Sequence, residues 1–118
     1  LILLRGRRSL EISADAFSQH EQIFERSLAS VMRGSILDAL SSNGMAVAAA
    51  TGDQEALRIC NLSIASGAIA AGISGSGPSI AIVCFQEDST SLSKLFSDSG
   101  LEVISTGIYV KEEISGVQ

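Results

Sequence analysis

The sequence predicts an α+β fold in which helices cover one face of a sheet. Short apolar runs typical of strands stand at 1–4, 79–85 and 101–110, whereas apolar residues between 15 and 71 recur at helical spacing. With 46% hydrophobic and 18% charged residues among 118, the composition suits one packed domain spanning 1–118. Packing helices on a sheet buries the apolar faces of both.

The first third of the chain is predicted to contain a strand, a second short strand and a helix. Leu1–Leu4 is a buried strand, and Ser9–Ser13 alternates apolar and polar side chains. Asp15 is the expected N-cap of a helix that runs to Met32, with Gly34 as its C-terminal stop. The apolar stripe of this helix consists of Phe17, Phe24, Leu28 and Val31.

Two further helices are predicted before the glycine-rich segment. The first begins at Ser35, with Asp38 in the capping-box position, and ends at Gly52. The second is capped by Asp53 and continues to Ala71. Its predicted packing face consists of Leu57, Cys60, Ile64, Gly67, Ala68 and Ala71.

The rest of the chain is predicted to form a strand, a short helix and a last strand. Ser79–Phe85 is a nearly continuous apolar run, which suits a central strand. A turn at Gln86–Thr90 leads to a helix near Ser91–Ser97, and Leu101–Val110 forms the closing strand.

Charge and composition narrow the possible partners. The net charge of −5 argues against nucleic acid, whose binding proteins usually present a basic surface. The longest nearly apolar stretch, Ile64–Ile73, is far too short to span a bilayer, so no membrane partner is expected. Cys60 and Cys84 are expected to be reduced, buried thiols of a cytoplasmic protein. His20 has no partner at ligand spacing, so no metal site is expected.

The segment Gly72–Ser79 is rich in glycine and is expected to lie between a helix and a strand. Such a loop can gather backbone N–H groups into a nest for anionic oxygens, or it can be a plain turn that ends a helix. The dinucleotide fingerprint needs the order strand, loop, helix, so the expected order of helix, loop, strand excludes it. A Walker A loop is excluded because no Lys directly follows the glycines. Phosphate bound here would need loop amides and groups supplied from elsewhere, because a helix C-terminus repels it.

The stretch Gly72-Ile-Ser-Gly-Ser-Gly-Pro-Ser-Ile-Ala resembles the third conserved motif of the GHMP kinases, the superfamily of galactokinase, homoserine kinase, mevalonate kinase and phosphomevalonate kinase. Its flanks are similar to the archaeal type of shikimate kinase, since Arg33-Gly-Ser-Ile-Leu-Asp-Ala-Leu-Ser-Ser-Asn-Gly-Met is followed by Thr51-Gly-Asp. Leu1–Arg8, Glu21–Ser27 and Val103–Gly107 extend the resemblance over nearly the whole chain.

The resemblance implies the C-terminal domain of such a kinase, a ferredoxin-like α/β plait with helices on one face of a mostly antiparallel sheet. It implies phosphoryl transfer from ATP, with Mg²⁺, to the 3-hydroxyl of shikimate in aromatic amino acid biosynthesis. The phosphate- and substrate-binding residues that it implies are Gly72, Ser74, Gly75, Ser76, Gly77 and Ser79. The family's principal phosphate loop and its catalytic residues belong to an N-terminal ATP-binding domain that nothing here matches. The chain begins with Leu, so we expect it to be part of a longer protein and inactive alone.

Asn43 and Arg5 are candidate substrate contacts. The Asn43 amide is suited to a hydroxyl, while Gly44 either admits a ligand or marks a kink. The cluster of Arg5, Arg7 and Arg8 either pairs with the carboxylate of shikimate or lies solvated in a turn. The alternative functions are homoserine kinase or another GHMP kinase, and a non-catalytic, small-molecule-binding regulatory domain.

Overall fold

The computed structural model describes residues 1–6, 13–74 and 77–108. Within them it contains five helices and one four-stranded sheet with the order β2-β3-β1-β4, in which all neighbouring strands are antiparallel. This confirms the predicted α+β class. The elements are β1 (Ile2–Leu4), α1 (Ala14–Gln19), α2 (Glu21–Met32), α3 (Ile36–Thr51), α4 (Gln54–Ala65), β2 (Ala70–Ile73), β3 (Ile80–Val83), α5 (Gln86–Asp98) and β4 (Glu102–Ile104).

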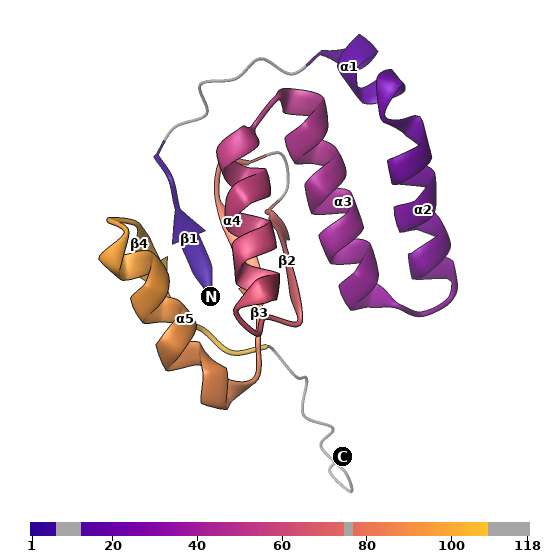
Figure 1. Ribbon diagram of the computed structural model, residues 1–118. Coiled ribbons are helices and arrows are strands. Elements are labelled where there is room, and N and C mark those ends of the chain that lie inside the picture. The colour runs from indigo at the N-terminus through magenta and orange to yellow at the C-terminus, as the bar shows by residue number, and fades with distance from the viewer. Residues whose placement is uncertain (7–12, 75–76, 109–118) are drawn as a thin grey trace, which may run out of the picture.

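One face of the sheet carries the core. The register places Leu3 opposite Ile80 on β3 and Val103 on β4, and Leu3 and Ile80 are fully buried. Side chains alternate between the two faces of a strand, so Ile2 and its partner Ala81 point to the other face, where both are half-buried. In Figure 1, α4 and α5 lie side by side in front of the sheet and cover its core face.

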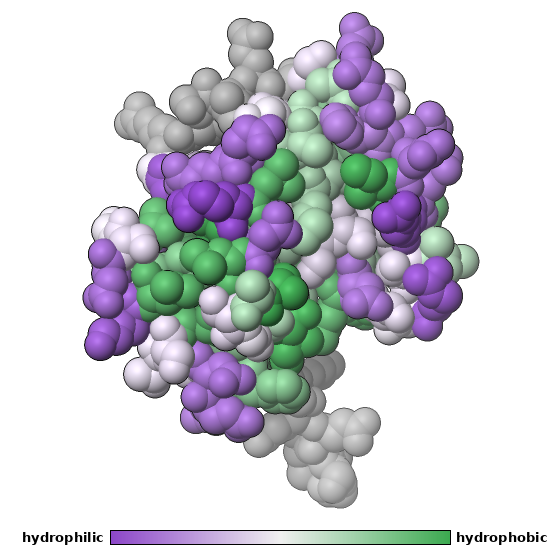
Figure 2. All heavy atoms as spheres, viewed as in Figure 1, coloured by the Kyte–Doolittle hydropathy of each residue, from purple (hydrophilic) through white to green (hydrophobic). Residues whose placement is uncertain are grey.

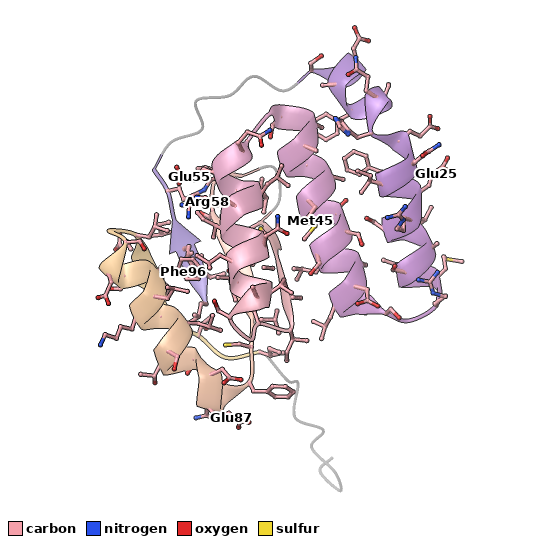
Figure 3. The ribbon with its side chains drawn as sticks, viewed as in Figure 1. Glu25, Met45, Glu55, Arg58, Glu87 and Phe96 are labelled. Carbon is pink, nitrogen blue, oxygen red and sulfur yellow. The ribbon has the colours of Figure 1, made fainter. Side chains whose placement is uncertain are left out.

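The layer between the helices and the sheet is apolar. Phe96 is 2% exposed and points from α5 toward the sheet and α4 (Figure 3). It belongs to one cluster with Ile59 and Cys60 of α4 and Leu3 of β1. On the face drawn in Figure 2, hydrophobic residues gather over the same region between α4 and α5. Burial of these apolar groups is the main force that holds the helices on the sheet.

The edge strand β2 is covered by α3. The Ala71 N–H, at the edge of the sheet, donates a hydrogen bond to Ser41 Oγ of α3 at 3.1 Å. Two facing glycines allow this close approach, because a Cβ on Gly44 would lie 2.3 Å from Gly72 Cα and a Cβ on Gly72 would lie 2.7 Å from the Leu40 carbonyl oxygen. An uncovered edge would expose unpaired backbone groups, and here a helix shields them.

The predicted helix from Asp53 to Ala71 is wrong after Ala65. Helix α4 ends at Ala65, Gly67 turns the chain with a φ of +108°, and Ala70–Ile73 forms strand β2. A short apolar run of small residues fits a helix and a strand equally well by periodicity. The strand is selected by its partners, since β2 pairs with β3 along its whole length and lies against α3.

The predicted helix from Asp15 to Met32 is broken into α1 and α2 at His20. Its N-cap is Ser13, whose Oγ accepts the Ala16 N–H, rather than Asp15. The structure describes no residue of the predicted strand Ser9–Ser13 except Ser13, so positions 9–12 of that prediction lie outside the described residues.

The predicted apolar stripe of this helix does not face the core. Leu28 is 63% exposed and Val31 47%, whereas Ser27 and Ser30 of α2 are buried. Phe24 is the exception, because it is half-buried and stacks on Phe17 of α1. Helix α2 packs on α3, outside the layer that covers the sheet (Figure 1). Small serine side chains let these two helices approach closely.

Other boundaries differ by local details. The predicted capping box at Ser35 is wrong, since its side chain makes no capping hydrogen bond, although α3 does end at Gly52 in left-handed conformation. The predicted turn at Gln86–Thr90 is wrong because α5 begins at Gln86. The last strand is shorter than Leu101–Val110, of which residues 109 and 110 are not described.

The two cysteines are free thiols. Cys60 is buried in α4, as expected, and Cys84 is half-buried directly after β3. Burial in the apolar layer raises the pKa of the Cys60 thiol to about 11, because the thiolate would lose its hydration there.

Candidate functional site

The glycine-rich segment closes a β-hairpin between β2 and β3. The Ser74 N–H donates to the Ser79 carbonyl at 2.8 Å, and the Gly77 N–H donates to the Ser74 carbonyl at 3.2 Å. Gly77 adopts a φ of +96°, which favours glycine at this position. The predicted placement between a helix and a strand is therefore wrong. The element directly before the loop is strand β2, so the loop does not follow the negative end of a helix dipole.

This hairpin changes how the loop can meet an anion. The N–H groups of Ser74 and Gly77 are used inside the loop, while Gly75 and Ser76 lie outside the described residues. Ser74 is exposed and carries a hydroxyl at the start of the loop, and Ser79 is half-buried at its end.

Arg5 joins the loop to the start of α4. Its Nε donates to the Pro78 carbonyl at 2.6 Å, its Nη1 donates to Asp53 Oδ1 at 3.1 Å, and its Nη2 donates to Asp53 Oδ2. The side chain of Arg5 is only 9% exposed and that of Asp53 13%. Because Leu3 pairs with Ile80, β1 ends beside the residues that enter β3, which brings Arg5 to the loop.

Asp53 has two tasks at this junction. Its Oδ1 also accepts the Ala56 N–H at 3.0 Å, so it is the N-cap of α4, as predicted. The hydrogen bonds from the Arg5 guanidinium hold the pKa of Asp53 below its ordinary range and raise the pKa of Arg5. The carboxylate is therefore charged in the folded protein and unsuited to take up a proton during catalysis.

Arg5 alone does not make this site favourable for binding an anion. Asp53 neutralises the guanidinium, and Glu55 Oε1 lies 3.9 Å from Arg5 Nη1 as a second negative group. Figure 3 shows Glu55 and Arg58 on the first turns of α4, near the end of β1. A phosphate or carboxylate ligand at this point would have to displace Asp53 from Arg5 or be held by other donors.

The remaining candidates lie on α3 and β2. Gly72 is buried in β2 against Gly44, so the close approach that Gly44 permits is that of a strand. Asn43, next to Gly44, is exposed on α3 and leaves its amide available to a ligand. The structure thus brings Arg5 to the exit of the loop and places Gly72 two residues before its entry.

Sequence reasoning missed Asp53 as the partner of Arg5. Its position before a helix predicts the N-cap, yet no local pattern links two residues that are 48 positions apart. The Pro78 carbonyl was missed for the same reason, although Pro78 itself marked the loop.

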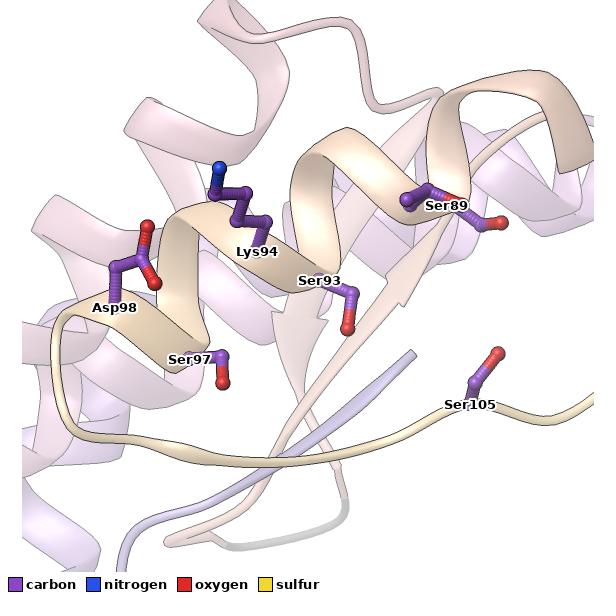
Figure 4. A pocket seen from close by; sticks show the side chains of 7 residues that line it. Ser89, Ser93, Lys94, Ser97, Asp98 and Ser105 are labelled. Carbon is purple, nitrogen blue, oxygen red and sulfur yellow. The ribbon is translucent and has the colours of Figure 1, made fainter.

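Two hollows in the described part of the chain lie elsewhere. One of about 430 Å³ lies between α5 and the segment after β4, and hydroxyls of Ser89, Ser93, Ser97 and Ser105 line it. In Figure 4, Ser93 and Ser97 point toward the segment that carries Ser105. The other, about 710 Å³, lies against β1 and β3 on the half-buried face of the sheet. Neither is lined by a described residue of the glycine loop.

The described residues also bear on metals and membranes. No group of three His, Cys, Asp or Glu side chains among them is placed to hold a metal ion. None of the described helices combines the length and the hydropathy that crossing a bilayer requires.

In comparisons with known proteins, no family model, no curated protein and no solved structure matches this chain.

Proposed function

We propose that this chain is the C-terminal, phosphate-facing domain of an ATP-dependent small-molecule kinase of the GHMP type, with shikimate as the phosphoryl acceptor. The observation that carries the proposal is the motif Gly72-Ile-Ser-Gly-Ser-Gly-Pro-Ser, in which a hydrogen bond from the Ser74 N–H to the Ser79 carbonyl closes a β-hairpin and Pro78 lies beside the N-terminus of α4. Homoserine is the alternative acceptor within the same family.

The topology supports the proposal. The chain runs from β1 through the helices to the β2–β3 hairpin, then through α5 to β4, and its sheet order is β2-β3-β1-β4. This order of elements and strands supports a ferredoxin-like plait, the fold that the resemblance implies. In the proposal, α1 to α3 are an elaboration of the first crossover.

In the proposed reaction this domain positions the reactants and does not supply a catalytic base. Phosphoryl transfer depends on holding the two reactants in line and on stabilising charge. In the proposal, the amides of Gly75 and Ser76 and the hydroxyl of Ser74 contact phosphate oxygens, and the Asn43 amide contacts the acceptor. MgATP is bound mainly by an N-terminal domain that this sequence does not contain.

A regulatory domain that binds a small molecule without catalysis is the second candidate. It is favoured by the state of Asp53, because this carboxylate at the loop is an N-cap and ion-pair partner with a lowered pKa. A carboxylate that is held in an ion pair and a helix cap suits ligand binding better than proton transfer.

A substrate panel on the complete protein tests both candidates. ADP release should be strongest with shikimate when shikimate, homoserine, mevalonate and galactose are compared at equal concentration. Gly75→Val should abolish turnover and leave the far-UV circular dichroism unchanged. Gly107→Val is the matched control, since a Cβ on this exposed glycine would meet nothing within 4 Å. ADP release with none of the four acceptors, or undiminished turnover in Gly75→Val, contradicts the kinase proposal.

A further inference from the structure

We infer that Arg5 and Asp53 are positioning residues that fasten the glycine loop to the N-terminus of α4. The part of this inference that concerns turnover rests on the proposed function, whereas the part that concerns the loop does not. In this role Arg5 acts on the loop through the Pro78 carbonyl rather than by contact with a substrate.

The contacts form a continuous chain from a helix to the loop. Asp53 is fixed to α4 by the hydrogen bond from the Ala56 N–H at 3.0 Å, and its negative charge suits the helix N-terminus. Arg5 is fixed to both oxygens of Asp53, and its Nε holds the Pro78 carbonyl at 2.6 Å. The hydrogen bonds from the Ser74 N–H to the Ser79 carbonyl and from the Gly77 N–H to the Ser74 carbonyl lie within the loop, so these two bonds set its shape but do not orient it against α4.

The geometry requires arginine. A guanidinium can donate two parallel hydrogen bonds to one carboxylate and still direct its Nε to a third acceptor. A lysine carries the same charge on one nitrogen and cannot satisfy Asp53 with both oxygens while reaching Pro78. Since the Arg5 side chain is only 9% exposed, water does not easily replace the lost contacts.

The contact between Arg5 and Pro78 affects the whole loop because Pro78 lies at the loop exit. Pro78 is followed by Ser79, whose carbonyl closes the loop by accepting the Ser74 N–H. Moving Pro78 therefore moves both ends of the loop, and with them the amides that are proposed to contact phosphate. A displacement of about 1 Å at such a site can lower a rate about a hundredfold.

The test compares Arg5→Lys with Asp53→Asn, which keeps a good N-cap but removes the charge. In this chain, amide hydrogen exchange of Ser74 and Gly77, followed by NMR, should accelerate at least about fivefold in both variants. The double variant should exchange these amides no faster than the stronger single variant, since each substitution breaks the same link from Asp53 through Arg5 to Pro78. Glu55→Gln is the matched control, because Glu55 is 57% exposed and 3.9 Å from Arg5, and it should leave the exchange unchanged.

In the complete protein, Arg5→Lys should lower kcat about tenfold to a hundredfold while the KM for the acceptor changes less than about twofold. Wild-type exchange rates in Arg5→Lys and Asp53→Asn would overturn the fastening. Faster exchange with unchanged kcat would overturn its role in turnover. If the wild-type protein phosphorylates none of the four acceptors, the proposed kinase fails, whereas the exchange rates still decide whether Arg5 and Asp53 hold the loop.

Discussion

Replacing Gly44 by Ala tests the close packing of α3 on β2. A Cβ at this position would lie 2.3 Å from Gly72 Cα and 2.7 Å from the Ile73 nitrogen, whereas ordinary van der Waals contacts begin at 3.4 Å. Both neighbours are backbone atoms of a paired strand, so no side chain can rotate away. Helix and strand must therefore separate by roughly 1 Å in a tightly packed interior.

The expected cost is the balance of three effects. Overpacking in a core typically costs about 1–3 kcal/mol, and a contact with backbone belongs at the upper end. Separation also weakens the hydrogen bond from the Ala71 N–H to Ser41 Oγ, which contributes about 1 kcal/mol. The helix preference of Ala over Gly returns about 1 kcal/mol. The free energy of unfolding should fall by about 2–3 kcal/mol.

Urea unfolding followed by far-UV circular dichroism measures this loss. Asn43→Ala is the matched control, because Asn43 is the exposed neighbour on the same helix and its replacement changes only helix propensity. We expect the control to stay within about 0.5 kcal/mol of wild type. A Gly44→Ala variant as stable as wild type, or more stable, would refute the close approach of α3 to β2.

Three further outcomes follow from the packing and charges. The Arg5 guanidinium holds the pKa of Asp53 in the folded protein below its ordinary 3.8. As the pH falls, Asp53 of the unfolded chain therefore binds a proton first. The ion pair stabilises the folded protein fully above pH 3.8, and this stabilisation is lost as the pH falls through the lower folded pKa. Asp53→Asn should therefore lose less stability than wild type between pH 6 and pH 3 in urea titrations, and an equal loss contradicts the ion pair. A disulfide reagent at pH 8 should label Cys84 well before Cys60, whose pKa is raised to about 11 by burial, and equal rates would contradict that burial. Phe96→Ala should lower the free energy of unfolding by about 3–5 kcal/mol, and a loss below about 1 kcal/mol is incompatible with its place in the core.

Local signals predicted the elements that depend on local chemistry. Asp53 caps α4 as expected, and Gly34 and Gly52 stop α2 and α3 with positive φ. The strands at Leu1–Leu4 and Ser79–Phe85 were recognised because short apolar runs bounded by turn residues have few other solutions.

The predictions failed where distant partners decide the structure. Ala70–Ile73 is apolar and small, and its sequence continues the helical spacing of α4. It becomes a strand because β3 supplies its hydrogen bonds and because Gly72 faces Gly44 across the interface with α3. Leu28 and Ser27 show the same effect, since the apolar side chain is exposed and the polar one is buried against α3.

The candidate site was predictable in its loop and not in its surroundings. Three glycines followed by proline marked the loop from sequence alone, because few other segments need both backbone freedom and restraint. Arg5 was recognised as a cation near a turn, but its partner depends on β1 ending beside the start of β3. Such a pairing is a property of the sheet register, which the sequence of either segment does not contain.

The hairpin also changes the electrostatic argument about phosphate. A loop at a helix C-terminus would repel an anion, whereas a loop fastened beside the N-terminus of α4 lies near the favourable end of a helix. That gain is limited, because Asp53 already occupies the helix terminus and, with Glu55, outweighs the single charge of Arg5. Charge compensation for a phosphate at this point must then be supplied by groups other than Arg5. The contribution that these residues can make is a fixed loop geometry, and the exchange rates of Ser74 and Gly77 measure that geometry directly.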